Sequence, residues 1–242
     1  LNAADCALVG GHTGEGSELA LGFAVNGLID SESLGDSKED DARAGTALMT
    51  KGGLRPGQVL ILTKPIGTGT LFAANMRHKA KGPWIQEALH SMLQSNLVGA
   101  QCLHRHSSTA CTAVNEFGLL GQLVEMVESS SAPSRVRVQL DLAAMPLLDG
   151  ALETAAAGFT STLQPQNVRL RRAIHDLETV SSDPRYPLLF DPQTAGGLLA
   201  SVSEDVAQTC IDELHRSGYI HAAIIGAVQP QSDRSEPISI SC

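Results

Sequence analysis

The stretch at residues 107–127 reads SSTACTAVNEFGLLGQLVEMV and joins a strand pattern to a helix pattern. Residues 109–114 are small or β-branched, which is typical of a buried strand. Asn115 is a good N-cap, because its side-chain oxygen can accept a backbone N–H of the next helix. From Phe117 the apolar residues recur at helical spacing. The stretch therefore predicts a strand, a tight turn and a helix. Such a corner suits phosphate, although an ordinary structural corner has the same pattern.

The rest of the chain alternates strand and helix patterns around this corner. Further strands are expected at residues 58–63, 135–142, 188–191, 198–202 and 220–228. Helices are expected at residues 71–77, 83–103, 148–157 and 203–216, with an irregular segment at 158–177. This order predicts an α/β fold, an α+β two-layer sandwich with one mixed sheet covered by helices on one face.

The ends of the chain have a different character. Residues 1–5 resemble the end of a helix, and strands are expected at 6–9 and 18–29. The segment 30–43 carries six carboxylates, but their spacing does not match a calcium-binding loop, so a solvated linker is expected. Three regions follow: residues 1–50, which end a preceding domain and include the acidic linker; an α/β domain at 51–230; and a flexible tail at 231–242.

Composition excludes several classes of function. Of the 242 residues, 43% are hydrophobic and 18% charged, enough apolar surface for a globular core. A net charge of −9 and only 3% aromatic residues argue against nucleic-acid and membrane binding. The five cysteines are scattered and none forms CxxC, so neither a disulfide framework nor a zinc site is indicated. Reduced thiols and a cytoplasmic location are the simplest expectation.

Two glycine-rich loops are candidates for ligand contact. Residues 64–70, KPIGTGT, lie between a strand and a helix, which is the order of a phosphate loop without its usual lysine motif. Residues 192–197, PQTAGG, precede a second strand. Asn96 lies within the expected helix at 83–103, where a pocket role and a plain surface role are equally open.

Four stretches together resemble the selenophosphate synthetases (selenide, water dikinases) of the aminoimidazole ribonucleotide synthetase-like superfamily. They are VGGHT at 9–13, LTKPIGTG at 62–69, TAVNEFGLLGQ at 112–122 and DPQTAGGLL at 191–199. The resemblance covers residues 1–228. It implies a C-terminal α/β domain preceded by the last part of an N-terminal ATP-binding domain, through which members form homodimers. It also implies the conversion of ATP, selenide and water to selenophosphate, AMP and phosphate with Mg²⁺.

The resemblance assigns roles to particular residues. It implies that Gly10, Gly11, His12 and Thr13 contact ATP. The candidate pocket residues are Lys64, Gly67, Thr68, Gly69, Asn96, Asn115, Asp191, Gln193 and Thr194. No catalytic residue and no metal ligand is assigned within the chain. The family's metal-binding aspartate position is Ala113 here, where a carboxylate would be expected to face the phosphates, and Asn115, Glu116 and Gln122 also depart from the family pattern.

Two functions remain in competition. The first is the C-terminal region of a selenophosphate synthetase, with nucleotide and selenide as ligands. The second is a catalytically degenerate domain that binds a nucleotide or a partner; some members of the family that it resembles are fused to a flavoprotein dehydrogenase module. Ala113 favours the second, and the retained glycine-rich loops favour the first. By itself the fragment is not expected to hydrolyse ATP.

Overall fold

The computed structural model describes residues 6–28, 48–130, 136–175, 177–231 and 236–242, and these fall into two units. The first unit, residues 6–28, contains neither helix nor strand. The strands expected at 6–9 and 18–29 are therefore absent from its described residues. The reason is that a strand is stabilised by a hydrogen-bonded neighbour, and here alternating apolar side chains such as Leu19, Leu21 and Phe23 are exposed. The acidic segment 30–43 lies outside the described residues.

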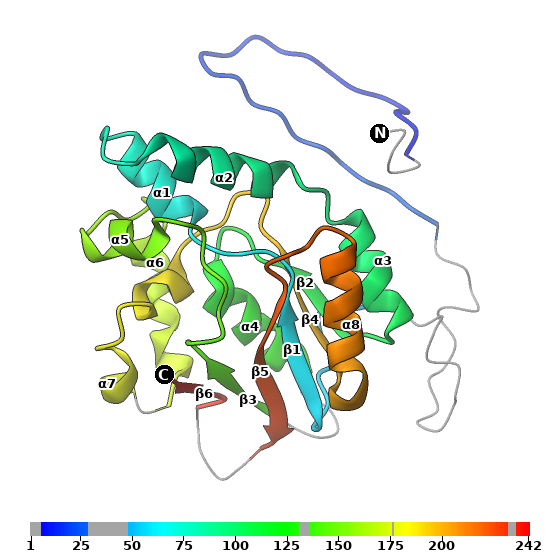
Figure 1. Ribbon diagram of the computed structural model, residues 1–242. Helices are drawn as coiled ribbons and strands as arrows, with labels where there is room; N and C mark the ends of the chain where they lie inside the picture. The colour runs from blue at the N-terminus through cyan, green and yellow to red at the C-terminus, as the bar shows by residue number, and fades with distance from the viewer. Residues whose placement is uncertain (1–5, 29–47, 131–135, 176, 232–235) are drawn as a thin grey trace. The chain divides into compact units, whose positions relative to one another are not determined.

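The second unit is built on a mixed six-stranded sheet with the order β2-β4-β1-β5-β3-β6 (Figure 1). Its strands are β1 (Gln58–Leu62), β2 (Ala110–Ala113), β3 (Val136–Asp141), β4 (Leu198–Ser203), β5 (Ala223–Pro230) and β6 (Ile238–Ser241). Neighbouring strands are antiparallel except for β3 and β6, which run parallel. The expected mixed sheet is confirmed.

Strand β1 lies at the centre of the sheet because all five of its residues, QVLIL, are buried. Its side chains alternate between two apolar clusters, one on each face of the sheet. Leu60 and Leu62 belong to the larger cluster, which we call the α4 face, and Val59 and Ile61 belong to the smaller one, which we call the α8 face.

Helices cover both faces of the sheet, where the sequence predicted one covered face. On the α8 face lie α3 (Leu97–Arg105) and α8 (Glu204–Arg216), which contribute Leu103, Ile211 and Leu214 to its cluster. The apolar stripe of α8 could have predicted a second covered face, because such a stripe must pack against another apolar surface.

The α4 face carries the remaining elements of the second unit. They are α1 (Thr68–Asn75), α2 (Gly82–Leu93), α4 (Gly118–Ser129), α5 (Ala151–Ala156), α6 (Gln164–Asn167), the 3₁₀ helix η3 (Val168–Ala173), α7 (Leu177–Val180) and the 3₁₀ helix η4 (Tyr186–Phe190). No helix among the described residues is long and apolar enough to cross a membrane.

Three elements differ from the sequence prediction. The helix expected at 83–103 is two helices, because Gln94 is extended and its carbonyl accepts a hydrogen bond from buried Lys64. The strand expected at 188–191 lies mostly in the 3₁₀ helix η4, which has Pro187 in its first turn, where the fixed φ of proline favours a helical turn. Residues 238–241 of the expected flexible tail form β6.

Candidate functional site

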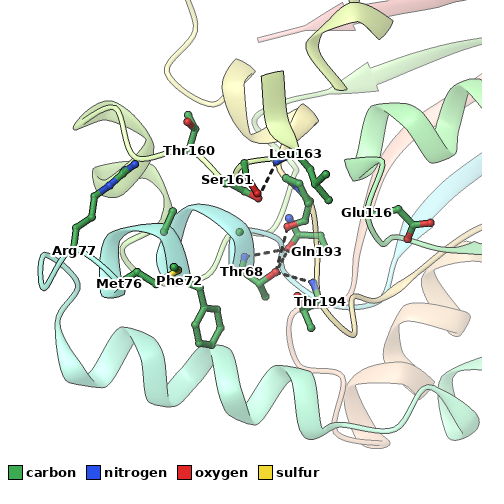
Figure 2. Close-up of a pocket in the computed structure, with 14 residues that line it drawn as sticks. Thr68, Phe72, Met76, Arg77, Glu116, Thr160, Ser161, Leu163, Gln193 and Thr194 are labelled. Atoms are coloured by element: carbon green, nitrogen blue, oxygen red, sulfur yellow. Dashed lines mark hydrogen bonds between the residues drawn. The ribbon is translucent and has the colours of Figure 1, made fainter. Parts of the chain in front are cut away.

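Two loops meet beside the end of β1 and the start of α1, and Gln193 holds them together. Its Oε1 accepts hydrogen bonds from the backbone N–H groups of Gly67 at 2.9 Å and Thr68 at 3.2 Å. The backbone N–H of Thr194 donates in turn to Thr68 Oγ1 at 3.0 Å (Figure 2). The loop at 192–197 is therefore fastened to the first turn of α1.

Asp191 lies beneath this contact and is fully buried. Its Oδ2 accepts from the backbone N–H of Gly69 at 3.0 Å and from Gln193 Nε2 at 2.9 Å, whereas its Oδ1 is buried without a partner. Burial, which outweighs these hydrogen bonds, raises the pKa of Asp191 to about 7. The carboxyl group therefore stays largely protonated just below neutral pH.

The first turn of α1 has no free N–H groups for a phosphate at positions 67–69. The N–H groups of Gly67 and Thr68 donate to Gln193, and that of Gly69 donates to Asp191. Side chains of the 191–194 segment thus take the place that an anion occupies at a phosphate loop. The strand, loop and helix order was predicted correctly, but these N–H groups are already paired.

A cavity of about 520 Å³ adjoins this contact. Figure 2 shows Thr68, Gln193 and Thr194 on one side of it, with Phe72 in α1, Met76 and Arg77 just after the end of that helix, and the segment 160–163 opposite. The exposed Glu116 lies at its edge and is the one carboxylate among the residues that line it. Hydroxyl groups, one cation and an aromatic ring make this a mixed polar and apolar surface.

Lys64 and Asn96 belong to a second contact, which joins the break between α2 and α3 to the same loop. Lys64 is buried, and its Nζ donates to the carbonyls of Gln94 at 2.6 Å and Ala195 at 3.2 Å. Burial lowers the pKa of Lys64. Asn96 Nδ2 donates to the carbonyl of Gly196 at 2.9 Å. Neither residue lines the cavity beside α1. Both instead hold the 192–197 loop, through their hydrogen bonds to Ala195 and Gly196.

Asn115 acts through its backbone and not as an N-cap. Its carbonyl accepts from the N–H groups of Gly118 at 3.0 Å and Gln193 at 2.9 Å. Helix α4 begins at Gly118, with Phe117 at the N-cap position and no side-chain cap. Gly118 has φ +69°, and a Cβ there would lie 2.9 Å from the carbonyl oxygen of Leu189. The expected capping role was wrong because the corner packs directly against η4.

Ala113 does not lie in the cavity. It packs in the apolar cluster of the α8 face with Ala100 and Cys111. A carboxylate at this position would therefore meet apolar neighbours before it met the residues around α1. Gly10, Gly11, His12 and Thr13 belong to the first unit, where all four are exposed, and their ATP contact remains a prediction.

Sequence reasoning missed the residues opposite α1. Thr160, Ser161, Thr162 and Leu163 line the cavity, and Thr70 Oγ1 donates to the carbonyl of Phe159 at 2.7 Å to hold this segment near α1. The segment was read as irregular because it has no periodic pattern. Its clustered hydroxyl residues were the available signal.

Comparison with known proteins identifies the family of the chain. Residues 55–236 match the family described as "AIR synthase related protein, C-terminal domain". Among curated proteins, the chain is similar to "Selenide, water dikinase" of Trichlorobacter lovleyi, with 34% identity over 96% of this chain and 62% of that protein. It is also similar to "Selenide, water dikinase" of Clostridioides difficile, with 28% identity over 94% of this chain and 60% of that protein. The chain thus spans about 60% of the length of these relatives.

Solved structures show the same fold at low sequence identity. The hydrogenase maturation protein HypE of E. coli superposes with a TM-score of 0.54 at 16% identity, covering 78% of this chain and 47% of that one. A thiamine-monophosphate kinase of Stenotrophomonas maltophilia superposes with a TM-score of 0.52 at 14% identity, covering 80% and 52%. At these identities the likeness concerns the fold alone.

Proposed function

Because the chain belongs to the AIR synthase related protein C-terminal domain family, we propose that it is the C-terminal region of a selenide, water dikinase. The intact protein would convert ATP, selenide and water to selenophosphate, AMP and phosphate. The observation that carries the proposal is the contact between the KPIGTG and DPQTAGG loops. Both motifs were identified from the sequence, and Gln193 and Asp191 join them through the first turn of α1.

The chain's own residues would shape one side of the nucleotide site. Gln193 and Asp191 fix the 67–69 backbone, so the cavity beside α1 keeps its form before a ligand arrives. Arg77 lines this cavity and would attract phosphate oxygens. Gly10, Gly11, His12 and Thr13 would supply backbone contacts to ATP, and a homodimer would form through an N-terminal domain.

Magnesium fits this cavity only as a partner of the nucleotide. Mg²⁺ in phosphate sites is held by one or two carboxylates together with phosphate oxygens. Glu116 is the carboxylate that the described cavity residues offer, and Ala113 supplies none. Glu116 would bind a Mg²⁺ ion together with the phosphate oxygens of the nucleotide. The ion would supply positive charge that neutralises the phosphates.

A second candidate is a degenerate domain that keeps the fold and loses the chemistry. The observation that favours it is that the N–H groups of Gly67, Thr68 and Gly69 are already paired with side chains. In that case the two loops would serve stability alone.

A chimera separates the two candidates. The part of the Clostridioides difficile relative that precedes its matched region is joined to this chain, and AMP formation from ATP is measured with and without selenide. Selenide-dependent AMP formation supports the first candidate. In the same chimera, Gln193→Ala should lower the rate on the order of tenfold or more, because it frees the 67–69 backbone.

The positive control is the complete relative, which should form AMP. The negative control is residues 1–242 alone, which should form no AMP. Gln229→Ala, at a half-buried position of β5 away from the cavity, is the matched glutamine control and should leave the rate unchanged. A folded chimera that binds ATP without forming AMP would favour the degenerate domain.

A further inference from the structure

Two cysteines and a histidine from distant parts of the sequence meet on the α8 face. Cys102 lies in α3, His106 follows the end of that helix, and Cys210 lies in α8. One ligand atom from each of the three residues lies within 4.8 Å of the other two, and this is the one such group found among the described residues. Both cysteines are fully buried, and the His106 side chain is 13% exposed.

The spacing of these residues suits a shared ligand. Cys102 and His106 are four positions apart, so their side chains lie on the same face of α3. Cys210 approaches from α8, which packs against α3. In a tetrahedral zinc site the ligand atoms are about 3.8 Å apart for sulfur, given Zn–S bonds of about 2.3 Å. The three ligand atoms already lie within 4.8 Å of one another, so small side-chain rotations would bring them to such a separation.

The carboxylate of Glu213 completes the arrangement. Its Oε2 accepts a hydrogen bond from His106 Nε2 at 2.9 Å, and its Oε1 accepts from Arg105 Nε at 3.0 Å. A histidine that binds a metal usually donates its other ring N–H to a carboxylate, which fixes the ring and raises its basicity.

The donor set selects the kind of ion. Thiolates and imidazole favour Zn²⁺ over Mg²⁺ or Ca²⁺, which take oxygen ligands. Two thiolates balance the charge of a divalent cation, and Arg105 balances Glu213. A cysteine binds a metal as the thiolate, so binding of the cation would release the thiol protons.

An ion could reach these residues from solvent. His106 lines a surface cavity of about 430 Å³ together with Arg105 and Ser107. The two sulfur atoms lie behind the histidine, in the apolar cluster between α3, α8 and the sheet. This gives the buried donors a polar entrance, as a metal site requires.

We propose that Cys102, His106 and Cys210 bind a thiophilic divalent cation, Zn²⁺, which joins α3 to α8, with Glu213 orienting the histidine. The three side chains supply three of the four ligands of a tetrahedral ion, and water from the surface cavity would supply the fourth. The proposal is independent of the reaction proposed above. It was not predictable from the sequence, because Cys102 and Cys210 are separated by more than a hundred residues and neither belongs to a CxxC motif.

The test uses the full chain with Cys6→Ser, Cys111→Ala and Cys242→Ser, so that only the two proposed cysteine ligands remain. The metal-free protein is titrated with Co²⁺ and then with Zn²⁺. We expect one Co²⁺ per chain, thiolate-to-cobalt charge-transfer absorption, the visible bands of tetrahedral cobalt, and displacement by Zn²⁺. Zinc should also raise the Tm.

Variants identify the ligands. Cys210→Ser and His106→Ala should abolish the charge-transfer band or weaken binding strongly, and Glu213→Gln should weaken it about 10- to 100-fold. The matched control is Cys111→Ala as the single change in the otherwise unaltered chain. Cys111 lies on the same face but outside the group, so this variant should bind the cation as the unaltered chain does. If Cys210→Ser fails to fold, the more exposed His106 and Glu213 variants decide the question.

Three results would overturn the proposal. The first is cobalt binding without thiolate charge transfer. The second is equal affinity in the parent protein and the His106→Ala variant. The third is a disulfide between Cys102 and Cys210 in protein purified without reductant, which would show that the pair is oxidised and not a cation site.

Discussion

At the scale of single residues, Asp191 links stability to pH. Its folded-state pKa of about 7 lies above its ordinary value of 3.8, so the folded chain keeps a proton that the unfolded chain releases between these values. Its contribution to stability is fully present below about pH 4 and is lost as the pH rises through 7. A shift of this size corresponds to a total on the order of 4 kcal/mol.

Asp191→Asn should remove most of this dependence. The amide oxygen can accept both hydrogen bonds that Oδ2 accepts now, and the amide does not ionise. Urea unfolding at pH 5 and pH 8 measures the effect. The wild type should lose about 2–3 kcal/mol more than the variant over this interval. Parallel losses in the two proteins would show that Asp191 is already ionised at pH 5.

The two tyrosines offer a matched pair for a second prediction. Tyr219 is buried, and its hydroxyl accepts from the backbone N–H of Gly99 at 2.8 Å and donates to the carbonyl of Ser95 at 2.5 Å. It supplies the cap that Asn96 does not give to the first turn of α3. Tyr219→Phe should lower the free energy of unfolding by about 1–3 kcal/mol, because two backbone groups lose their partner.

Tyr186 provides the control for this measurement. Its ring packs edge-on against Phe190, and its hydroxyl makes no hydrogen bond to any described residue. Tyr186→Phe should change the free energy of unfolding by less than about 0.5 kcal/mol. Equal losses in both variants would assign the effect to the rings and not to the Tyr219 hydroxyl.

At the scale of elements, two glycines in the first turns of helices have opposite surroundings. A Cβ on Gly69 in α1 would lie 2.5 Å from Asp191 Oδ1 and 2.6 Å from the carbonyl oxygen of Pro192, whereas a Cβ on Gly82 in α2 would meet nothing within 4 Å. Gly69→Ala should lower stability by about 2 kcal/mol or more, because α1 must move off the 191–194 segment.

Gly82→Ala should leave stability unchanged or raise it by up to about 1 kcal/mol, since alanine restricts the unfolded chain. Thermal and urea unfolding of the two variants measure the contrast. If the Gly69→Ala protein is as stable as wild type, α1 can move away from Asp191 without lowering the free energy of unfolding.

The elements also show how far the sequence could be read. The strands at 58–63, 135–142 and 198–202 and the helix at 203–216 were predicted well, because their apolar period is regular. The break at Gln94 depends on Lys64, thirty residues away, and no local pattern encodes that hydrogen bond. The same holds for the site. The sequence motifs placed Gly67, Thr68 and Gln193 among the candidate pocket residues, but no motif indicated the segment 160–163.

At the scale of the whole molecule, the chain consists of two units that differ in internal packing. Residues 6–28 expose their apolar side chains, whereas residues 48–242 contain both apolar clusters. A protein that begins at residue 48 should therefore keep the Tm of the full chain within a few degrees, about the effect of 0.5 kcal/mol. A melting curve followed by circular dichroism measures this, and a large fall in Tm would mean that the first unit stabilises the second.

The parallel pairing of β6 with β3 protects the edge of β3 from self-association. With β6 in place, the hydrogen-bonding edge of β3 is occupied by the chain's own last residues. An uncovered strand edge is a template onto which other chains add, and this is how ordered aggregates grow. Removal of residues 238–241, or their displacement from β3, would expose that template. The resistance of the protein to aggregation during storage therefore depends on residues 238–241.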